Sequence, residues 1–263
     1  MMARATPLKP GRAPLRERVS PEEWQTRVDL AACYRLVAHY GMTDMIYTHI
    51  TARVPGPDHH FLINPYGLLF DEINASSLVK INLEGKTVLQ PDHDYPVNHA
   101  GYVIHSAIHA ARADAHCVIH THTRAGMAVS AQKCGLLPLT QTAMRFYGQL
   151  AYHDYEGPAV DLRERESLVR DLGTRRAMIL RNHGLLVCAP TVPEAFNTIY
   201  WLERACQAQV DALAGGQEVM LPPADVAEKT AHLYLPEVRR PWGVLEWPTM
   251  LRLLDRRDPS YRD

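Results

Sequence analysis

The stretch Cys117-Val118-Ile119-His120-Thr121-His122-Thr123 places two histidines inside a run of residues that favour β-structure. We interpret it as a buried strand at the centre of the fold. Side chains alternate between the two faces of a strand, so His120 and His122 point the same way. Neutral imidazole suits Zn, Fe, Cu and Ni, and two imidazoles on one face form half of a transition-metal site.

The other half is predicted downstream, at Arg181-Asn182-His183-Gly184. This segment lies between two apolar runs, which indicates a strand, a turn and a returning strand. A glycine in the turn lets the backbone reverse and leaves His183 facing a cavity. Three histidines with one open coordination position form a common catalytic arrangement, in which the ion polarises an oxygen or activates water. The alternative is that all three are packed histidines bonded to the backbone.

The composition is that of a soluble globular protein. The chain has 263 residues, of which 46% are hydrophobic and 22% charged, and its net charge of −1 favours neither nucleic acid nor a membrane surface as a partner. No apolar run approaches the roughly 18 residues of a spanning helix. Five scattered cysteines without a C-x-x-C motif predict reduced thiols and a cytoplasmic location.

The pattern along the chain predicts one α/β domain over residues 19–263, after a disordered basic tail at 1–18. Residues 222–263 are interpreted as a C-terminal extension that docks on the domain or on a neighbouring subunit. The predicted helices begin at capping residues such as Ser20, Asp161 and Thr191. Helices are predicted at 20–41, 98–112, 125–132, 161–173 and 191–213. Strands are predicted at 45–54, 61–63, 78–83, 86–89, 117–123, 177–181 and 185–188.

Several motifs together resemble the class II aldolase/adducin family, and most closely its adducin-like branch, over roughly residues 22–255. The supporting runs are Ile46-Tyr47-Thr48-His49-Ile50-Thr51-Ala52-Arg53, Phe61-Leu62-Ile63-Asn64-Pro65-Tyr66-Gly67-Leu68-Leu69, Ala75-Ser76-Ser77-Leu78-Val79-Lys80, Ile104-His105-Ser106-Ala107-Ile108-His109, Val118-Ile119-His120-Thr121-His122-Thr123 and Arg181-Asn182-His183-Gly184-Leu185-Leu186.

The resemblance implies a three-layer α/β/α domain around a largely antiparallel sheet. It also implies a homo-oligomer, commonly a tetramer, with active sites near subunit contacts. In the family's aldolases the H-x-H pair and a later histidine bind one divalent metal ion, which here corresponds to His120, His122 and His183. Zinc is the expected ion, with manganese and iron as alternatives, and it stabilises the charge of an enediolate.

The chain departs from the aldolase pattern in two places. The family's catalytic glutamate corresponds to Gly101, and no carboxylate stands within residues 98–102. The turns that cradle phosphate in sugar-phosphate aldolases correspond here to 48–51, 64–67 and 99–100, where most small hydroxyl donors are missing. Cleavage of a phosphosugar by the usual route is therefore not expected.

The remaining candidates for the site have a polar side chain, or keep a residue of the family pattern. The candidates for proton transfer are His99, His105, Tyr152, His153 and Tyr155. The candidates for substrate binding are His49, Thr51, Asn64 and Gly67. For each of them a purely structural role is an equally valid interpretation. The helical pair His105 and His109 is interpreted as solvated or packed rather than as a metal site.

Three hypotheses for function follow. The first is a metal-dependent lyase that acts on a small 2-oxo or hydroxy-carbonyl acid by aldol cleavage or decarboxylation. Decarboxylation needs an electron sink more than a base, so the missing glutamate matters less there. The second is a non-haem iron oxygenase acting on a 2-oxo acid, although such sites normally use two histidines and a carboxylate. The third is a non-catalytic scaffold of the adducin type.

Overall fold

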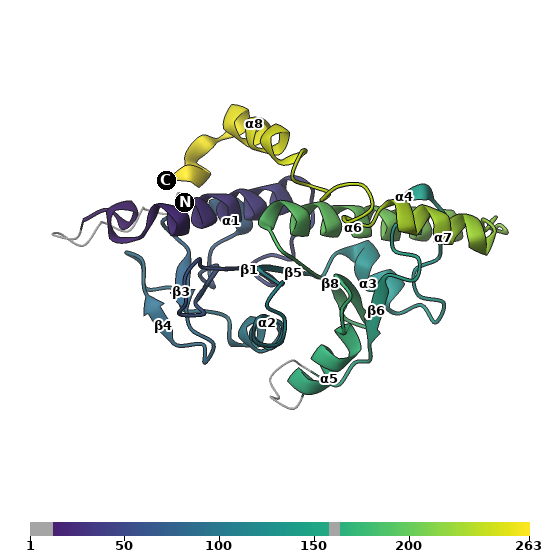
Figure 1. The fold of residues 1–263 in the computed structure, drawn as a ribbon, viewed down its shortest axis with the longest axis horizontal. Coiled ribbons are helices and arrows are strands. Elements are labelled where there is room, and N and C mark those ends of the chain that lie inside the picture. Colours follow the sequence, from purple (N-terminus) through teal and green to yellow (C-terminus); the bar gives the residue numbers. More distant parts are fainter. Residues whose placement is uncertain (1–12, 158–163) are drawn as a thin grey trace.

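The computed structural model describes residues 13–157 and 164–263, with His99, Ala100 and Glu164 described by their backbone alone. Eight strands form a single sheet in the order β4-β3-β2-β1-β5-β8-β7-β6 (Figure 1). Every neighbouring pair is antiparallel except β6 and β7, which are parallel. The strands are β1 His49–Arg53, β2 Phe61–Ile63, β3 Val79–Ile81, β4 Thr87–Leu89, β5 Cys117–Thr121, β6 Leu150–His153, β7 Ala177–Leu180 and β8 Gly184–Ala189.

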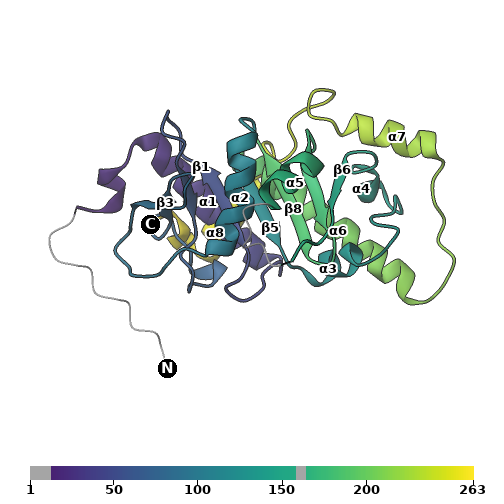
Figure 2. The same ribbon diagram turned by 90° about the horizontal axis from the view of Figure 1, so that it is seen from below.

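Helices cover both faces of this sheet (Figures 1 and 2). Helices α1 and α6 pack on one face, and α2 and α5 pack on the other. Alternation along β5 supplies both cores, because Ile119 packs in the core that includes Leu36 of α1, whereas Val118 packs in the core that includes Ile108 of α2. The helices are α1 Pro21–His39, α2 His99–Ala111, α3 Arg124–Ser130, α4 Gln141–Met144, α5 Glu164–Leu172, α6 Val192–Ala214, α7 Ala224–Leu233 and α8 Trp247–Arg257. The predicted three-layer fold with a largely antiparallel sheet is confirmed.

Local sequence signals explain where most of these elements begin. The Ser20 hydroxyl accepts a hydrogen bond from the amide of Glu23 at the start of α1, and Thr191 does the same for Glu194 at the start of α6. The predicted start of the first strand is wrong by four residues. Met45 and Thr48 have positive φ angles of 46° and 67°, so the chain turns there and pairs only from His49 onward. The predicted helix cap at Asp161 lies outside the described residues.

The two ends of the described chain lie close to α1. Leu15 is buried and begins a 3₁₀ helix, Leu15–Arg18, within the segment predicted as a tail, of which residues 1–12 lie outside the described part. In the C-terminal extension, α8 packs on α1, where the Trp247 indole donates to Asp29. Tyr261, in the 3₁₀ helix Pro259–Arg262, is fully buried. The described contacts of this extension are therefore with its own domain.

Two further features agree with the composition. Within the described residues, no helix is both long and apolar enough to cross a membrane. All five cysteines lie in the described part and are free thiols, four buried and Cys134 exposed.

Candidate metal centre and its cavity

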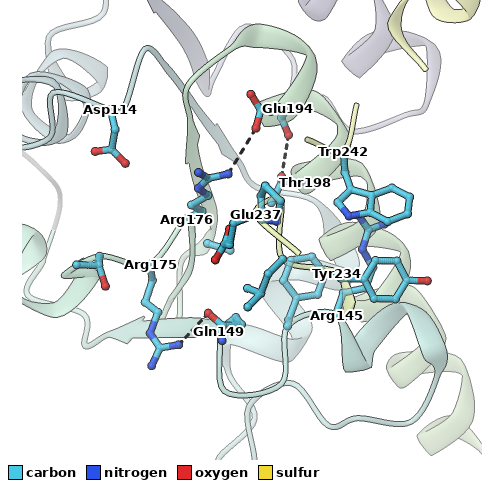
Figure 3. Close-up of a pocket in the computed structure, with 15 residues that line it drawn as sticks. Asp114, Arg145, Gln149, Arg175, Arg176, Glu194, Thr198, Tyr234, Glu237 and Trp242 are labelled. Atoms are coloured by element: carbon cyan, nitrogen blue, oxygen red, sulfur yellow. Dashed lines mark hydrogen bonds and ion pairs between the residues drawn. The ribbon is translucent and has the colours of Figure 1, made fainter. Parts of the chain in front are cut away.

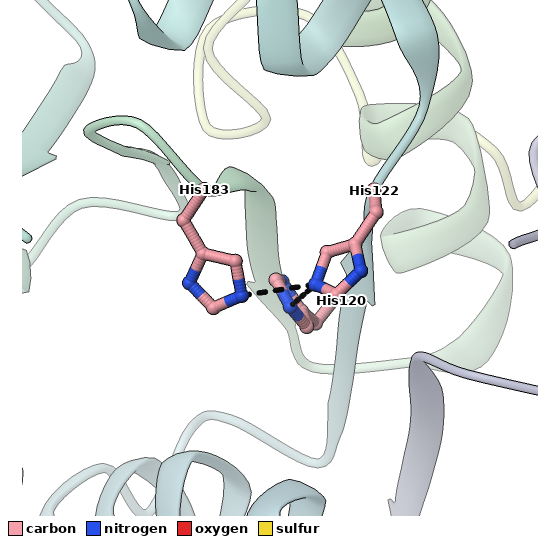
Figure 4. Close-up of side chains that lie close together, drawn as sticks. All are labelled: His120, His122 and His183. Carbon is pink, nitrogen blue, oxygen red and sulfur yellow. Dashed lines mark hydrogen bonds between the residues drawn. The ribbon is translucent and has the colours of Figure 1, made fainter. Parts of the chain in front are cut away.

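Three histidines converge where strand β5 ends and its neighbour β8 begins (Figure 4). His120 lies on β5, His122 directly follows it, and His183 lies in the turn between β7 and β8. The Nε2 atom of His122 is 2.8 Å from Nε2 of His120 and 2.9 Å from Nε2 of His183. The geometry required for the predicted cluster is therefore present, with all three rings on one side.

The turn that carries His183 depends on its two neighbours. Asn182 has a φ of 56°, a left-handed conformation that asparagine adopts more readily than most residues. A Cβ atom at Gly184 would lie 2.4 Å from the carbonyl oxygen of Thr121. Only glycine therefore lets β8 approach β5 closely enough to bring His183 to the other two rings.

Hydrogen bonds on the far side of two rings determine which nitrogen carries the proton. Nδ1 of His120 is 2.9 Å from the carbonyl oxygen of Leu185, which can only accept, so this nitrogen donates. Nδ1 of His122 is 3.1 Å from Oδ2 of Asp44 and donates to the carboxylate in the same way. When both rings are neutral, Nε2 of His120 and Nε2 of His122 therefore carry no proton, and their lone pairs face each other.

This donor set suits a divalent cation. Burial and the neighbouring imidazoles lower the pKa of His120, and burial followed by the proximity of His122 lowers the pKa of His183 to about 4, so both rings are neutral near pH 7. Zinc holds imidazole nitrogens at about 2.0–2.1 Å, which places adjacent ligand atoms about 3 Å apart. Bare lone pairs this close repel one another unless a cation lies between them. The backbone carbonyl and the carboxylate behind the rings are the usual outer partners of metal-binding histidines.

The cluster opens into a cavity of about 430 Å³, here called the histidine cavity. Polar groups at its wall come from the chain before β1, the start of α2 and the β7–β8 turn, and apolar groups come from α2 and α3. The lining residues are Tyr47, Thr48, His49, Asn98, Ile104, His120, His122, Met127, Tyr155, Gly157, Asn182 and His183.

Two further residues that the sequence analysis proposed for the site contribute to the wall of this cavity. His49 is buried, with its ring centroid 5.6 Å from that of His120. Tyr155 is 53% exposed at the mouth, and its ring centroid is 6.3 Å from that of His183. Both are therefore placed to contact a molecule bound next to the cluster.

Thr51 and His105 lie behind His49 rather than at the cavity wall. Both are fully buried, and the hydroxyl of Thr51 is 2.7 Å from Nδ1 of His105. Nε2 of His105 in turn is 3.0 Å from Nδ1 of His49. They reach the cavity only through His49.

Three other candidates lie away from the cavity. The Tyr152 hydroxyl accepts from the amide of Leu136, and Nδ1 of His153 is 2.8 Å from Oδ2 of Asp171. Buried Asn64 accepts from the hydroxyl of Tyr34. These interactions hold the fold together.

The remaining two candidates are Gly67 and His99. Gly67 has a φ of 138°, and its α-carbon lies against the ring of Tyr95. His99 begins α2, but its side chain lies outside the described residues.

Sequence reasoning did not identify Asp44, Asn98 or Met127. Asp44 is 78 residues from its partner His122 and lies in an irregular segment between α1 and β1, so no spacing pattern connects the two. Asn98 stands immediately before α2, where it was interpreted only as part of a helix. Met127 is an exposed hydrophobic residue on α3, and an exposed methionine has no signature in sequence.

A second cavity of about 370 Å³, here called the arginine cavity, lies beneath the segment that follows α7 (Figure 3). Its three arginines already have partners. Arg176 pairs with Glu194 at 3.4 Å, and Arg175 donates to the side chain of Gln149. The Arg145 guanidinium lies over the ring of Trp242, with its carbon 5.3 Å from the ring centroid.

Comparison with known proteins agrees with this fold. A family model described as the class II aldolase and adducin N-terminal domain matches residues 28–210. A crystal structure of an aldolase II superfamily protein from Pseudomonas syringae is 52% identical, with a TM-score of 0.89, and covers 95% of this chain and 100% of that one. An L-fuculose 1-phosphate aldolase from Glaciozyma antarctica PI12 is 28% identical, with a TM-score of 0.80, over 92% of this chain and 93% of that one.

The chain is also similar to the adducins. Alpha-adducin of Rattus norvegicus is 48% identical over 209 residues, which is 78% of this chain and 28% of the adducin. The match to the family model spans more than half of the sequence, and the structural match extends over nearly all of it. The chain therefore belongs to the class II aldolase and adducin family.

Proposed function

We propose that this protein is a metal-dependent lyase that acts on a small 2-oxo or hydroxy-carbonyl acid, by aldol cleavage or decarboxylation. The observation that carries the proposal is the convergence of three Nε2 atoms on one point, with separations of 2.8 and 2.9 Å. Membership of a family that includes a solved sugar-phosphate aldolase supports it. The three nitrogens belong to His120, His122 and His183.

These three residues are proposed to hold one divalent ion, with zinc as the first choice and manganese and iron as alternatives. When bound, such an ion supplies a Lewis acid that stabilises negative charge developing on the oxygens of a carbonyl acid. The protein's own contribution is to orient the rings. The Leu185 carbonyl and the Asp44 carboxylate fix the tautomers of His120 and His122, so their lone pairs are aimed before any ligand arrives.

The histidine cavity suits a small acid better than a phosphosugar. At about 430 Å³ it has room for a molecule of a few carbon atoms. Asn98, Asn182 and Thr48 offer polar groups for hydroxyl or carboxylate oxygens, and the described lining residues include no lysine or arginine to neutralise a phosphate dianion. A chelating 2-oxo acid needs no such cation, because it presents its two oxygens to the metal.

The first experiment is elemental analysis of protein purified without added metal. We expect about one ion per subunit in the wild type, a large loss in His120→Ala, and no change in His116→Ala, an exposed histidine near the start of the same strand. Cleavage of a panel of 4-hydroxy-2-oxo acids and decarboxylation of 2-oxo diacids would then be followed by product formation. Wild-type protein that stays metal-free after reconstitution would refute the proposal. Iron with substrate-dependent oxygen uptake would favour the oxygenase instead.

A non-catalytic scaffold is the second candidate, because alpha-adducin is 48% identical over 209 residues of this chain. A scaffold needs no bound ion for its role. Stoichiometric metal without turnover on any acid of the panel, together with capture of a stable protein partner, would favour it. We also propose a homotetramer, as the family resemblance implies. Light scattering of the purified protein measures that state directly.

A further inference from the structure

A continuous row of buried polar groups runs from the backbone after α2 to the histidine cavity. Nδ1 of His109 is 2.9 Å from the carbonyl oxygen of Ala115, and its Nε2 is 2.8 Å from the hydroxyl of Thr51. That hydroxyl is 2.7 Å from Nδ1 of His105, and Nε2 of His105 is 3.0 Å from Nδ1 of His49. All four side chains are buried, and only His49 reaches the cavity.

The direction of every hydrogen bond in this row follows from its first member. The Ala115 carbonyl can only accept, so Nδ1 of His109 donates and its Nε2 accepts from the Thr51 hydroxyl. Thr51 has a single hydroxyl proton, so it accepts in turn from Nδ1 of His105. Nε2 of His105 then accepts from Nδ1 of His49. Nε2 of His49 is left as a bare lone pair at the end of the row.

Packing against α2 fixes the position of this imidazole. A Cβ atom at Gly101 would lie 1.7 Å from Cδ2 and 2.2 Å from Nε2 of His49. The ring therefore occupies the space directly over the glycine, between β1 and α2. It lies beside His120, to which His49 is also paired in register across the sheet. A group so closely confined keeps one orientation relative to the cluster.

No other described residue at the cavity wall offers a comparable proton acceptor. The wall contains no carboxylate among the described residues. Tyr47 and Tyr155 carry phenol hydroxyls, which can donate a hydrogen bond to a molecule in the cavity. The lone pairs of His120 and His122 are directed at one another, and Nε2 of His183 faces the same point. His49 is the remaining lone pair in reach of a molecule in the cavity.

We propose that His49 is the catalytic proton acceptor of this site, held in the required tautomer by His105, Thr51 and His109. This inference rests on the proposed lyase function. His49 would touch the substrate, whereas the three residues behind it are positioning residues. Burial disfavours a charged ring, so the proton would be held briefly and then returned.

The proposed step balances with one proton. In aldol cleavage, the hydroxyl of a 4-hydroxy-2-oxo acid gives its proton to Nε2 of His49. The carbon–oxygen bond becomes a carbonyl, the C3–C4 bond breaks, and its electron pair forms the enolate of the 2-oxo acid. The proton then passes from Nε2 to C3. The products are an aldehyde and a 2-oxo acid, and the ring returns to its starting state.

The test uses the enolisation half of this reaction, which needs no knowledge of the natural substrate. Zinc-loaded protein is incubated in D₂O with pyruvate, 2-oxobutanoate or hydroxypyruvate, and the loss of C3 protons is followed by ¹H NMR. We expect exchange in the wild type and in the control His116→Gln. Exchange should fall by about 100-fold or more in His49→Gln, since loss of a general base typically costs about 10²–10⁴-fold. Gly101→Ala should have a similar effect, because the new methyl group displaces the ring. Zinc content should be unchanged in both variants.

A second readout does not depend on turnover. Ring ¹⁵N shifts of the metal-free protein report which nitrogen of each histidine carries the proton. We expect Nδ1–H on His49 in the wild type. Thr51→Val keeps the shape but removes the hydroxyl that connects His105 to His109, so the fixed tautomer should be lost and exchange should slow.

The outcomes separate the two proposals. If zinc-loaded wild-type protein exchanges none of the three acids, the lyase function is refuted. If the wild type exchanges and His49→Gln stays within about threefold of it, the role of His49 is refuted and the function stands. A proton found on Nε2 of His49 in the metal-free protein would also refute the inference.

Discussion

The histidine cavity and the arginine cavity differ little in volume, at about 430 and 370 Å³, but they differ in what their polar atoms do. In the arginine cavity each of the three arginines is met by a carboxylate, an amide or an aromatic ring of the protein itself. In the histidine cavity the lone pairs of His120 and His122 meet each other, and their protons point away. Volume alone does not mark a site. The difference lies in groups whose partners must come from outside.

The largest effect expected from this contrast is stabilisation by metal. Zinc at about 1,000 times its dissociation constant should raise the free energy of unfolding by about 4 kcal/mol, because it binds the folded state alone. His183→Ala should abolish this gain, since it removes one of the three converging nitrogens. Urea unfolding with and without zinc measures both. Equal stabilisation of the variant would place the ion elsewhere.

The next effect concerns Asp44, the hydrogen-bond partner of the His122 ring on the side away from the cluster. Asp44→Asn should weaken zinc binding by about 10- to 100-fold, the usual cost of losing an outer partner of a metal-binding histidine. Competition with a chromogenic chelator measures the affinity. Asp58→Asn, at an exposed turn, is the matched control and should leave it unchanged. An unaltered affinity in Asp44→Asn would show that this carboxylate does not orient His122.

A smaller effect is expected in the arginine cavity. The Arg145 guanidinium carbon lies 5.3, 4.6 and 5.3 Å from the ring centroids of Trp201, Tyr234 and Trp242. Arg145→Met should lower the free energy of unfolding by about 1–2 kcal/mol through lost cation–π attraction. Zinc content should not change. A fall in zinc content would contradict the separation of the two cavities.

The smallest effect is a dependence on pH at the rim of the arginine cavity. Two hydrogen bonds of 2.8 Å from Arg112 lower the pKa of Asp114 below its ordinary value of 3.8. A carboxylate with a lowered pKa stabilises the fold above pH 3.8, and this contribution is lost as the pH falls through the folded-state pKa. Asp114→Asn should therefore cost less than about 1 kcal/mol at pH 7, and almost nothing near pH 3. Urea unfolding at the two pH values measures the difference, and an equal cost at both would contradict it.

Periodicity and turn signals were sufficient to predict most elements, because each strand and helix carries its own pattern, whereas the three layers were implied by the family resemblance. The start of β1 was misplaced, since the positive φ angles at Met45 and Thr48 leave no mark in an apolar stretch that otherwise favours a strand. The convergence of His120, His122 and His183 followed from strand alternation and a glycine turn. The role of Asp44 could not be predicted in this way, because it depends on a tertiary contact with His122, which is 78 residues away in the sequence.

The row behind His49 illustrates the same limit. From their helical spacing, His105 and His109 were interpreted as a solvated or packed pair, and the structure has both of them buried on α2. Their bonding to Thr51 could not be predicted, because it requires the register of β1 against α2. Tyr152 and His153 were chosen for their chemistry, but they are not among the lining residues of the cavity, because their side chains bond to Leu136 and Asp171 instead.

The close approach of His49 to Gly101 also constrains how such sites can diverge. A side chain at position 101 and an imidazole at position 49 exclude each other, because a single added carbon would overlap the ring. A lineage could pass between the two arrangements only by emptying one position before filling the other. We therefore expect relatives to fall into two groups. One group has a glutamate at position 101 and a residue smaller than histidine at position 49, and the other has glycine at position 101 and histidine at position 49. The residues at these two positions would then indicate, from the sequence alone, which group transfers the proton in each member of the family.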